Sequence, residues 1–234
     1  MRQKNSSSGN VLFIVLACVA LFAALSFVMT RNSTGFDSAT SQEQNRLYAT
    51  EIIEYGNSLR PTVDRMLLVG GISDTNTAGN GILFSAVGAD AAYGAPGAQA
   101  STELFNAAGG RAAYLQPPAA ACAAACAYEF SGQYTITGVA DDAKSELAML
   151  LIGVTQDVCV RINSTLALGW GATIPTGDVL TLTRFDGVNY GNLGGANPIT
   201  LTGGANEFVN KRAFCYRESG GGQRYIFLYV LRAR

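Results

Sequence analysis

An uninterrupted apolar run near the N-terminus constrains this chain more than any other feature. Nineteen residues from Val11 to Met29 carry no charge. As an α-helix this run would be about 28 Å long, close to the ~30 Å hydrocarbon thickness of a bilayer. Arg2 and Lys4 precede it, whereas Arg31 alone follows closely, and this bias favours a cytoplasmic N-terminus. We therefore expect a single-pass protein of the inner (cytoplasmic) membrane with an exported C-terminal domain.

A cleaved secretory signal is the alternative interpretation of this run. The hydrophobic region of such a signal is about 7–15 residues long and is followed by a small-x-small cleavage site. Here the apolar run is longer, and the stretch from Phe27 to Arg31 offers no such site. The sequence therefore favours a retained helix, either intact or trimmed at its N-terminus.

The residues before the run resemble the leader of type IV pilins and type II secretion pseudopilins. The leader MRQKNSSSG is short, basic and polar, and it ends in Gly9 directly before the apolar helix. In that family a prepilin peptidase cuts after the glycine, and the helix first anchors the subunit and later packs in the filament core. The resemblance implies cleavage between Gly9 and Asn10, with the membrane and other pilin-like subunits as partners. It also implies anchoring and assembly through Val11, Leu12, Phe13, Ile14, Leu16, Leu21 and Phe22.

Two positions depart from the pattern of that family. The first mature residue is usually aromatic and the fifth is usually glutamate, whereas this sequence has Asn10 and Ile14. The standard charge pairing between neighbouring N-termini therefore lacks its usual acid here.

A second helical pattern follows the apolar run. Thr30 to Thr40 is a polar, glycine-containing stretch that predicts a break, and Ser41 is typical of a new N-cap. Pro61 predicts a kink or division, and Gly70-Gly71 predicts the end. In pilins, too, an anchor helix continues into an amphipathic helix packed on a sheet. The apolar positions recur at intervals of three and four residues, which predicts one buried helical face: Tyr48, Ile52, Tyr55, Leu59, Val63 and Met66.

The remaining chain predicts an exported α+β domain over 71–234, after a leader (1–9), an anchor (10–30), and a linker with the amphipathic helix (31–70). Residues 74–126 are rich in alanine, glycine and asparagine and predict long connections with short strand-like pieces at Gly81–Val87 and Ala112–Gln116. A further helix is predicted over Asp141–Asn163. Strands are predicted at 130–137, 179–185, 198–202, 213–217 and 224–232, the last two as a hairpin.

The predicted fold class is thus α+β. A transmembrane helix continues into an amphipathic helix, which packs on an antiparallel sheet with one further helix.

Four cysteines lie in the predicted exported part: Cys122, Cys126, Cys159 and Cys215. An even number in an exported chain favours two disulfides, for which three pairings are possible. Cys122–Cys126 is the local choice, and Cys159–Cys215 resembles the C-terminal disulfide loop of pilins. A zinc site is the alternative, but the spacings lack paired C-x2-C motifs. Cys18 lies in the apolar run, and we interpret it as a small apolar residue.

Composition and motifs give little support for catalysis or nucleic-acid binding. Charged residues make up 14% of the chain with a net charge of -1, so no basic excess exists to neutralise phosphates. The sequence contains no histidine, which removes the commonest general base and metal ligand. We expect no enzyme activity, no cofactor and no metal. Two hypotheses remain: a pilin-like structural subunit, or a non-assembling, membrane-tethered domain that binds a ligand.

Overall fold

The computed structural model describes residues 8–72, 81–140, 144–178, 184–185, 199–201, 204, 206–220 and 222–234. Side chains are described within these ranges except at residues 8–11 and 28–39. The chain divides into two compact units, Met1–Gln44 and Asn45–Arg234. The described residues of the first unit, 8–44, are helical, and the second unit contains the sheet.

Helix α1 runs from Ser8 to Leu68 without interruption. The predicted break between Thr30 and Thr40 is therefore wrong at the level of the backbone. Pro61 lies inside α1 and does not divide it. Proline removes one backbone donor, but the neighbouring Leu59 and Val63 are buried in the core, which holds the helix in place.

The predicted transmembrane helix is not borne out. Within the ranges that the structure describes, no helix is both long and apolar enough to cross a membrane. The described apolar side chains at the start of α1 extend from Leu12 to Phe27. The expected single-pass location in the inner membrane depended on this helix and is corrected with it.

Among its described residues, the second unit contains one six-stranded sheet. Its order is β3-β5-β6-β2-β1-β4. The strands are β1 (Tyr128–Ile136), β2 (Glu146–Val154), β3 (Thr176–Gly177), β4 (Ile199–Leu201), β5 (Ala213–Glu218) and β6 (Tyr225–Arg232).

The sheet is mixed, which corrects the antiparallel sheet that the sequence predicted. The three central pairs, β1–β2, β2–β6 and β5–β6, are antiparallel. The edge strands run parallel to their neighbours, β4 beside β1 and β3 beside β5. The predicted C-terminal hairpin is confirmed, with Ala213 opposite Tyr229 and Arg217 opposite Tyr225.

The predicted helix over Asp141–Asn163 is wrong. Residues Glu146–Val154 form β2, and a helix, α2, spans only Gln156–Thr165; residues 141–143 lie outside the described ranges. Strand β2 lies between β1 and β6 and is mostly buried on both faces, so its sequence ELAMLLIGV does not alternate between apolar and polar residues. In such a run, Leu147, Leu151 and Val154 have the spacing of a helix face by coincidence.

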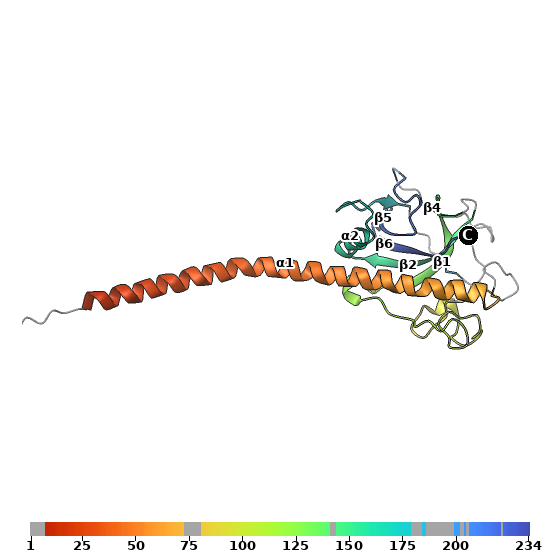
Figure 1. The fold of residues 1–234 in the computed structure, drawn as a ribbon, viewed down its shortest axis with the longest axis horizontal. Coiled ribbons are helices and arrows are strands. Elements are labelled where there is room, and N and C mark those ends of the chain that lie inside the picture. Colours follow the sequence, from red (N-terminus) through yellow and green to blue (C-terminus); the bar gives the residue numbers. More distant parts are fainter. Residues whose placement is uncertain are drawn as a thin grey trace, which may run out of the picture. The chain divides into compact units, whose positions relative to one another are not determined.

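Residues 45–68 of α1 lie along one face of the sheet, together with α2 (Figure 1). The amphipathic stripe predicted from the sequence is confirmed. Tyr48 is partly buried, and the buried positions are Ile52, Tyr55, Leu59, Val63 and Met66. On the other sheet face a second apolar cluster joins alternate residues of the strands, such as Leu150 and Leu228, to Phe208. Burial of both faces explains why the two middle strands, β2 and β6, are almost wholly apolar.

Residues 81–126 are largely irregular, as the sequence predicts, with two short 3-10 helices, η1 (Ala91–Tyr93) and η2 (Ala119–Ala121). The strand-like pieces predicted at 81–87 and 112–116 are not strands; an isolated bridge joins Leu83 to Glu103. Of the strand predicted at 179–185, only Arg184 and Phe185 are described, and they are not in a strand. The predicted strands at 130–137 and 198–202 correspond to β1 and β4.

Gly56 permits a close approach of α1 to the sheet. A Cβ atom at this position would lie 2.7 Å from two ring carbons of Tyr229 in β6. The ring cannot move easily because its hydroxyl donates to Asn57 Oδ1 at 2.8 Å. We therefore expect Gly56→Ala to lower the free energy of unfolding by about 1–3 kcal/mol. Chemical denaturation measures this change. Thr50→Ala, at an exposed position of α1, is the control, and an equal loss in both variants would contradict the packing argument.

Candidate self-association site

The first half of α1 carries a continuous exposed apolar surface. Leu12 and Phe22 are each 74% exposed, and the large apolar residues between them are more than half exposed. The surface comprises Leu12, Phe13, Ile14, Val15, Leu16, Val19, Leu21, Phe22, Leu25 and Phe27. Isolated exposed apolar residues are ordinary, but a continuous apolar patch is typical of an interaction site.

This apolar surface surrounds the helix. Successive residues of an α-helix lie about 100° apart, so the four consecutive exposed residues from Leu12 to Val15 point to all sides. A helix with a single apolar stripe needs one neighbour, whereas a helix that is apolar all round needs apolar surroundings on every side. The geometry therefore suits a bundle of several helices better than a two-helix contact.

The residues that the pilin resemblance singled out lie in this part of α1. Gly9 and Asn10 are in its first turn, one and two residues after Ser8. Their side chains, like that of Val11, are outside the described ones. Leu12, Phe13, Ile14, Leu16, Leu21 and Phe22 all belong to the exposed surface. Cleavage between Gly9 and Asn10 stays a prediction.

The second half of α1 is fixed to the folded unit by polar contacts as well as by its apolar stripe. Arg232 of β6 pairs with Asp64 at 3.2 Å. Tyr229 of the same strand donates to Asn57 at 2.8 Å. Both contacts reach from the central strand β6 to α1, so this half of the helix has a defined position on the sheet.

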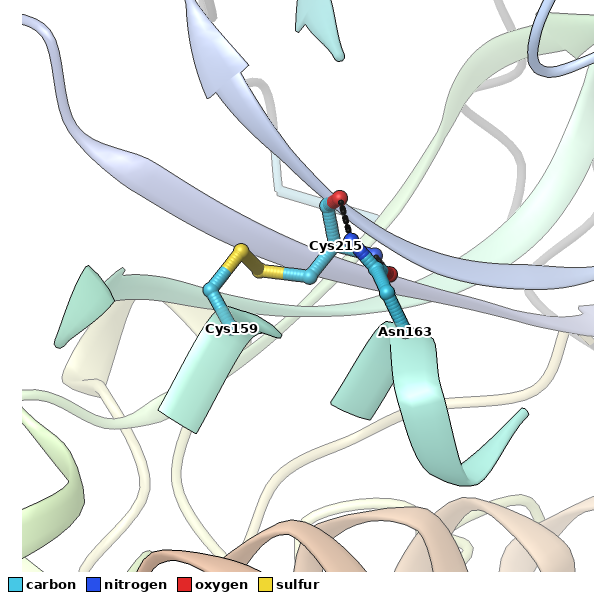
Figure 2. The surroundings of a disulfide bond; sticks show 3 residues. All are labelled: Cys159, Asn163 and Cys215. Atoms are coloured by element: carbon cyan, nitrogen blue, oxygen red, sulfur yellow. Dashed lines mark hydrogen bonds between the residues drawn. A yellow bond between two sulfur atoms is a disulfide. The ribbon is translucent and has the colours of Figure 1, made fainter. Parts of the chain in front are cut away.

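Two disulfides are present, Cys122–Cys126 and Cys159–Cys215. The second joins α2 to β5, and Asn163 lies one turn after Cys159 (Figure 2). The Asn163 side chain donates to the carbonyl of Cys215 and accepts from its amide, both at 2.8 Å. The side-chain amide of Asn163 thus forms the two hydrogen bonds with the Cys215 backbone that a neighbouring strand would form. The sequence analysis missed this role because a helical asparagine gives no signal of its partner.

The two disulfides differ in accessibility, which predicts selective reduction. Cys159 and Cys215 are fully buried, whereas Cys122 and Cys126 are partly exposed. Reduction requires a thiolate to reach a disulfide sulfur. We expect a mild reductant to open Cys122–Cys126 at least about ten times faster than Cys159–Cys215 under native conditions. Mass spectrometry after alkylation measures both rates, with Cys18 as the thiol that reacts without reductant. Equal rates for the two pairs would contradict this expectation.

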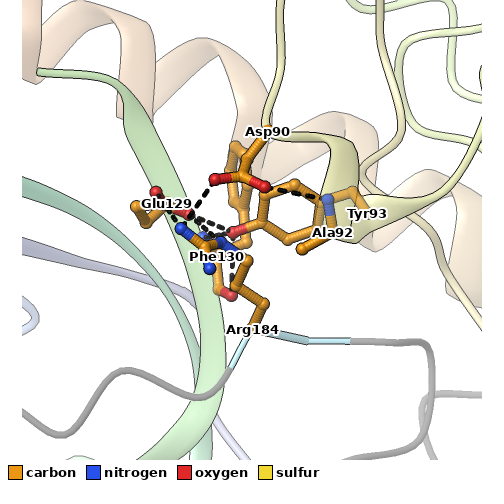
Figure 3. A network of polar contacts seen from close by, with 6 residues as sticks. All are labelled: Asp90, Ala92, Tyr93, Glu129, Phe130 and Arg184. Carbon is orange, nitrogen blue, oxygen red and sulfur yellow. Dashed lines mark hydrogen bonds and ion pairs between the residues drawn. The ribbon is translucent and has the colours of Figure 1, made fainter.

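A partly buried polar network joins the irregular segment to β1 (Figure 3). Arg184 makes two hydrogen bonds to Glu129, each of 2.9 Å, and an ion pair with Asp90 at 2.8 Å. The Tyr93 hydroxyl donates to Glu129 at 2.8 Å and accepts from the amide of Phe130 at 2.6 Å. The two buried members, Tyr93 and Glu129, thus both have hydrogen-bond partners, as buried polar groups require.

This network is suited to structure rather than to catalysis. Burial raises the pKa of the Tyr93 hydroxyl far above its ordinary value, so this group stays protonated. The hydrogen bonds to Glu129 raise the pKa of the Arg184 guanidinium, which therefore stays charged. A neutral phenol and a fixed cation provide neither a nucleophile nor a proton acceptor near neutral pH. Both carboxylate oxygens of Glu129 already accept hydrogen bonds from Tyr93 and Arg184. The sequence analysis missed this network because its members are up to 94 positions apart, counted from Asp90 to Arg184.

No metal site is visible in the part of the chain that the structure describes, where no three His, Cys, Asp or Glu side chains gather closely enough to hold an ion. Comparisons with protein-family models, with curated proteins and with solved structures give no match. The exposed apolar half of α1 is therefore the candidate site, on the strength of its own chemistry.

Proposed function

We propose that this chain is a pilin-like structural subunit that self-assembles through the first half of α1. The observation that carries the proposal is the apolar surface from Leu12 to Phe27, which is exposed on all sides of the helix. Covering it with equivalent helices from other copies removes this surface from water, which stabilises an assembly by about 25 cal/mol per Å² of apolar area. The second half of α1 is held on the folded unit, so each copy would contribute one such helix to a shared core.

The leader resemblance supports the same proposal. According to this resemblance, a prepilin peptidase would remove residues 1–9, and Asn10 would begin the mature chain. Mass analysis of the protein from its own host tests this step: a chain that begins at Asn10 supports processing, and one that retains Arg2 and Lys4 contradicts it. Self-assembly does not depend on this outcome, because the apolar surface lies beyond the cleavage position.

The experiment that tests the proposed function compares two matched lysine substitutions on α1. Leu16 is 66% exposed within the apolar surface, and Leu68 is 73% exposed at the other end of the same helix. A lysine at position 16 would place a charge in an apolar bundle, which is strongly unfavourable unless the charge is paired. A lysine at position 68 meets no such bundle. We expect Leu16→Lys to prevent assembly and Leu68→Lys to leave it unchanged.

Sedimentation velocity after removal of detergent measures the result on the full chain. The proposal predicts large particles for the parent chain and for Leu68→Lys, and a monomer for Leu16→Lys. A monomeric parent chain would contradict self-assembly and would favour the alternative, a domain that acts singly on a ligand.

A further inference from the structure

A groove in the second unit has the chemistry of a binding site for a short amphipathic surface. Its cavity volume is about 350 Å³, and it lies where α1, the end of α2 and the start of β5 meet. Leu166, Leu168 and Tyr229 provide apolar lining, and Lys211 and Arg212 provide two cations. Both leucines are partly exposed and Arg212 is exposed, so the groove is open to another molecule.

The charge of the groove is not neutralised by the residues that the structure describes. Neither Lys211 nor Arg212 takes part in an ion pair with any of them. One acid lies near the rim, because Asn57 of the lining donates to Glu54 at 3.3 Å. Two cations against one acid leave the groove positive, which favours an acidic partner.

The turn after α2 holds the two leucines in the groove. Ala167 between them has a left-handed backbone, with φ of 53°. Its amide donates to Ser164 at 3.0 Å, and the amide of Leu168 donates to Asn163 at 3.1 Å. These bonds are typical of a helix C-terminus that turns back on itself. The groove lining is therefore part of an ordered turn.

The same chain presents a complementary surface on α1. Leu47 is 61% exposed, and Glu51 lies one helical turn later at an exposed position. Residues four positions apart on a helix are neighbours on its surface. Neither residue lines the groove, so an apolar side chain beside an acid stands free for a contact with another molecule.

We propose that Leu47 and Glu51 of one copy dock into the Leu166–Leu168 groove of the next copy, with Glu51 facing Lys211 and Arg212. This inference rests on the proposed self-assembly and adds a specific lateral contact to it. Because the two surfaces are different, the contact is heterologous. Heterologous contacts leave one surface of each kind open at the ends, so they propagate into filaments or close into rings.

Cross-linking between two cysteine variants tests the contact. The full chain carrying Cys18→Ser receives either Leu47→Cys or Leu168→Cys, and the two proteins are assembled together and treated with a short bismaleimide. We expect covalent dimers in the mixture and none in either variant alone. Leu68→Cys mixed with Leu168→Cys is the control and should stay monomeric on denaturing gels.

The possible failures are distinguishable. Particles that sediment without cross-linking in the mixture would overturn the docking contact and leave self-assembly intact. Cross-linking of Leu47→Cys with itself would also overturn it, because the contact would then be symmetric. The absence of particles in every sample would overturn the proposed function together with this inference.

Charge reversal gives an independent test that does not need cysteines. We expect Glu51→Lys and Arg212→Glu each to raise the concentration at which particles form by about fivefold, the scale of an exposed ion pair. The double variant should form particles at nearly the concentration of the parent chain, because the ion pair is restored with opposite polarity. Single variants that assemble like the parent chain, or a double variant no better than either single one, would overturn the pairing.

Discussion

Replacing Cys159 and Cys215 together by alanine should lower the free energy of unfolding of the second unit by about 4 kcal/mol. The disulfide closes a loop between residues 56 positions apart, and closing a long loop restricts the unfolded chain most. In the folded state it clamps α2 to β5, where Asn163 completes the contact with Cys215. Its loss therefore removes a constraint on which both α2 and the hairpin depend.

Denaturation with guanidinium measures this effect through Trp170, the one tryptophan of the chain. Trp170 packs edge-to-face on Phe208, with ring centroids 6.0 Å apart. The matched control is Cys122→Ala with Cys126→Ala. Its cysteines are four positions apart, so the same reasoning predicts a loss of only about 2 kcal/mol. An equal or larger loss in the control would contradict the argument from loop length.

Phe84→Ala should cost about 3–5 kcal/mol, the range of large aromatic truncations in cores. Phe84 is fully buried and stacks on Phe130 of β1, with ring centroids 4.0 Å apart. Its ring also contacts Tyr93, Phe105 and Phe185. These rings attach the irregular segment to the sheet, so the truncation should loosen the segment before it unfolds the sheet.

Hydrogen exchange distinguishes local loosening from global unfolding. We expect amides of residues 81–126 to lose protection in Phe84→Ala while amides of β2 and β6 keep most of theirs. Val87→Ala is the control, because Val87 is 89% exposed and a surface substitution changes stability by about 0.5 kcal/mol or less. Uniform loss of protection across the sheet would show that the segment and the sheet unfold as one unit.

The sequence predicted those elements whose burial is one-sided or whose turns are distinctive. The stripe from Ile52 to Met66 was visible because one face of α1 packs on the sheet and the other meets water. The hairpin of β5 and β6 was visible because a glycine-rich turn separates two apolar strands.

The errors in the predicted elements have two causes: strands that are buried on both faces, and contacts between residues far apart in the sequence. Strand β2 is mostly buried on both faces and so has no period of its own. Helix α1 continues through the polar stretch from Thr30 to Thr40, although the glycine and polar residues there are local signals for a break. The mixed sheet arises from β3 and β4, which have only two and three residues. The segment of β4 was predicted as a strand, but such short strands do not reveal that their pairing is parallel.

The candidate site was partly predictable. The apolar run from Val11 to Met29 is evident in the sequence, and the pilin resemblance implied that it mediates assembly. The run alone also suggested a membrane span, which the structure does not bear out. The groove between α2 and β5 could not be predicted, because Leu168 and Arg212 come together only in the folded unit.

Cross-linking through Cys18 in the parent chain tests the central claim most directly. Cys18 is exposed within the apolar surface and is the one cysteine outside the two disulfides. If equivalent helices surround one another, a bifunctional thiol reagent with a long spacer should give covalent dimers in the assembled sample. It should give none in Leu16→Lys or after dilution in detergent. Sedimenting particles that give only monomers would contradict a shared core built from the first half of α1.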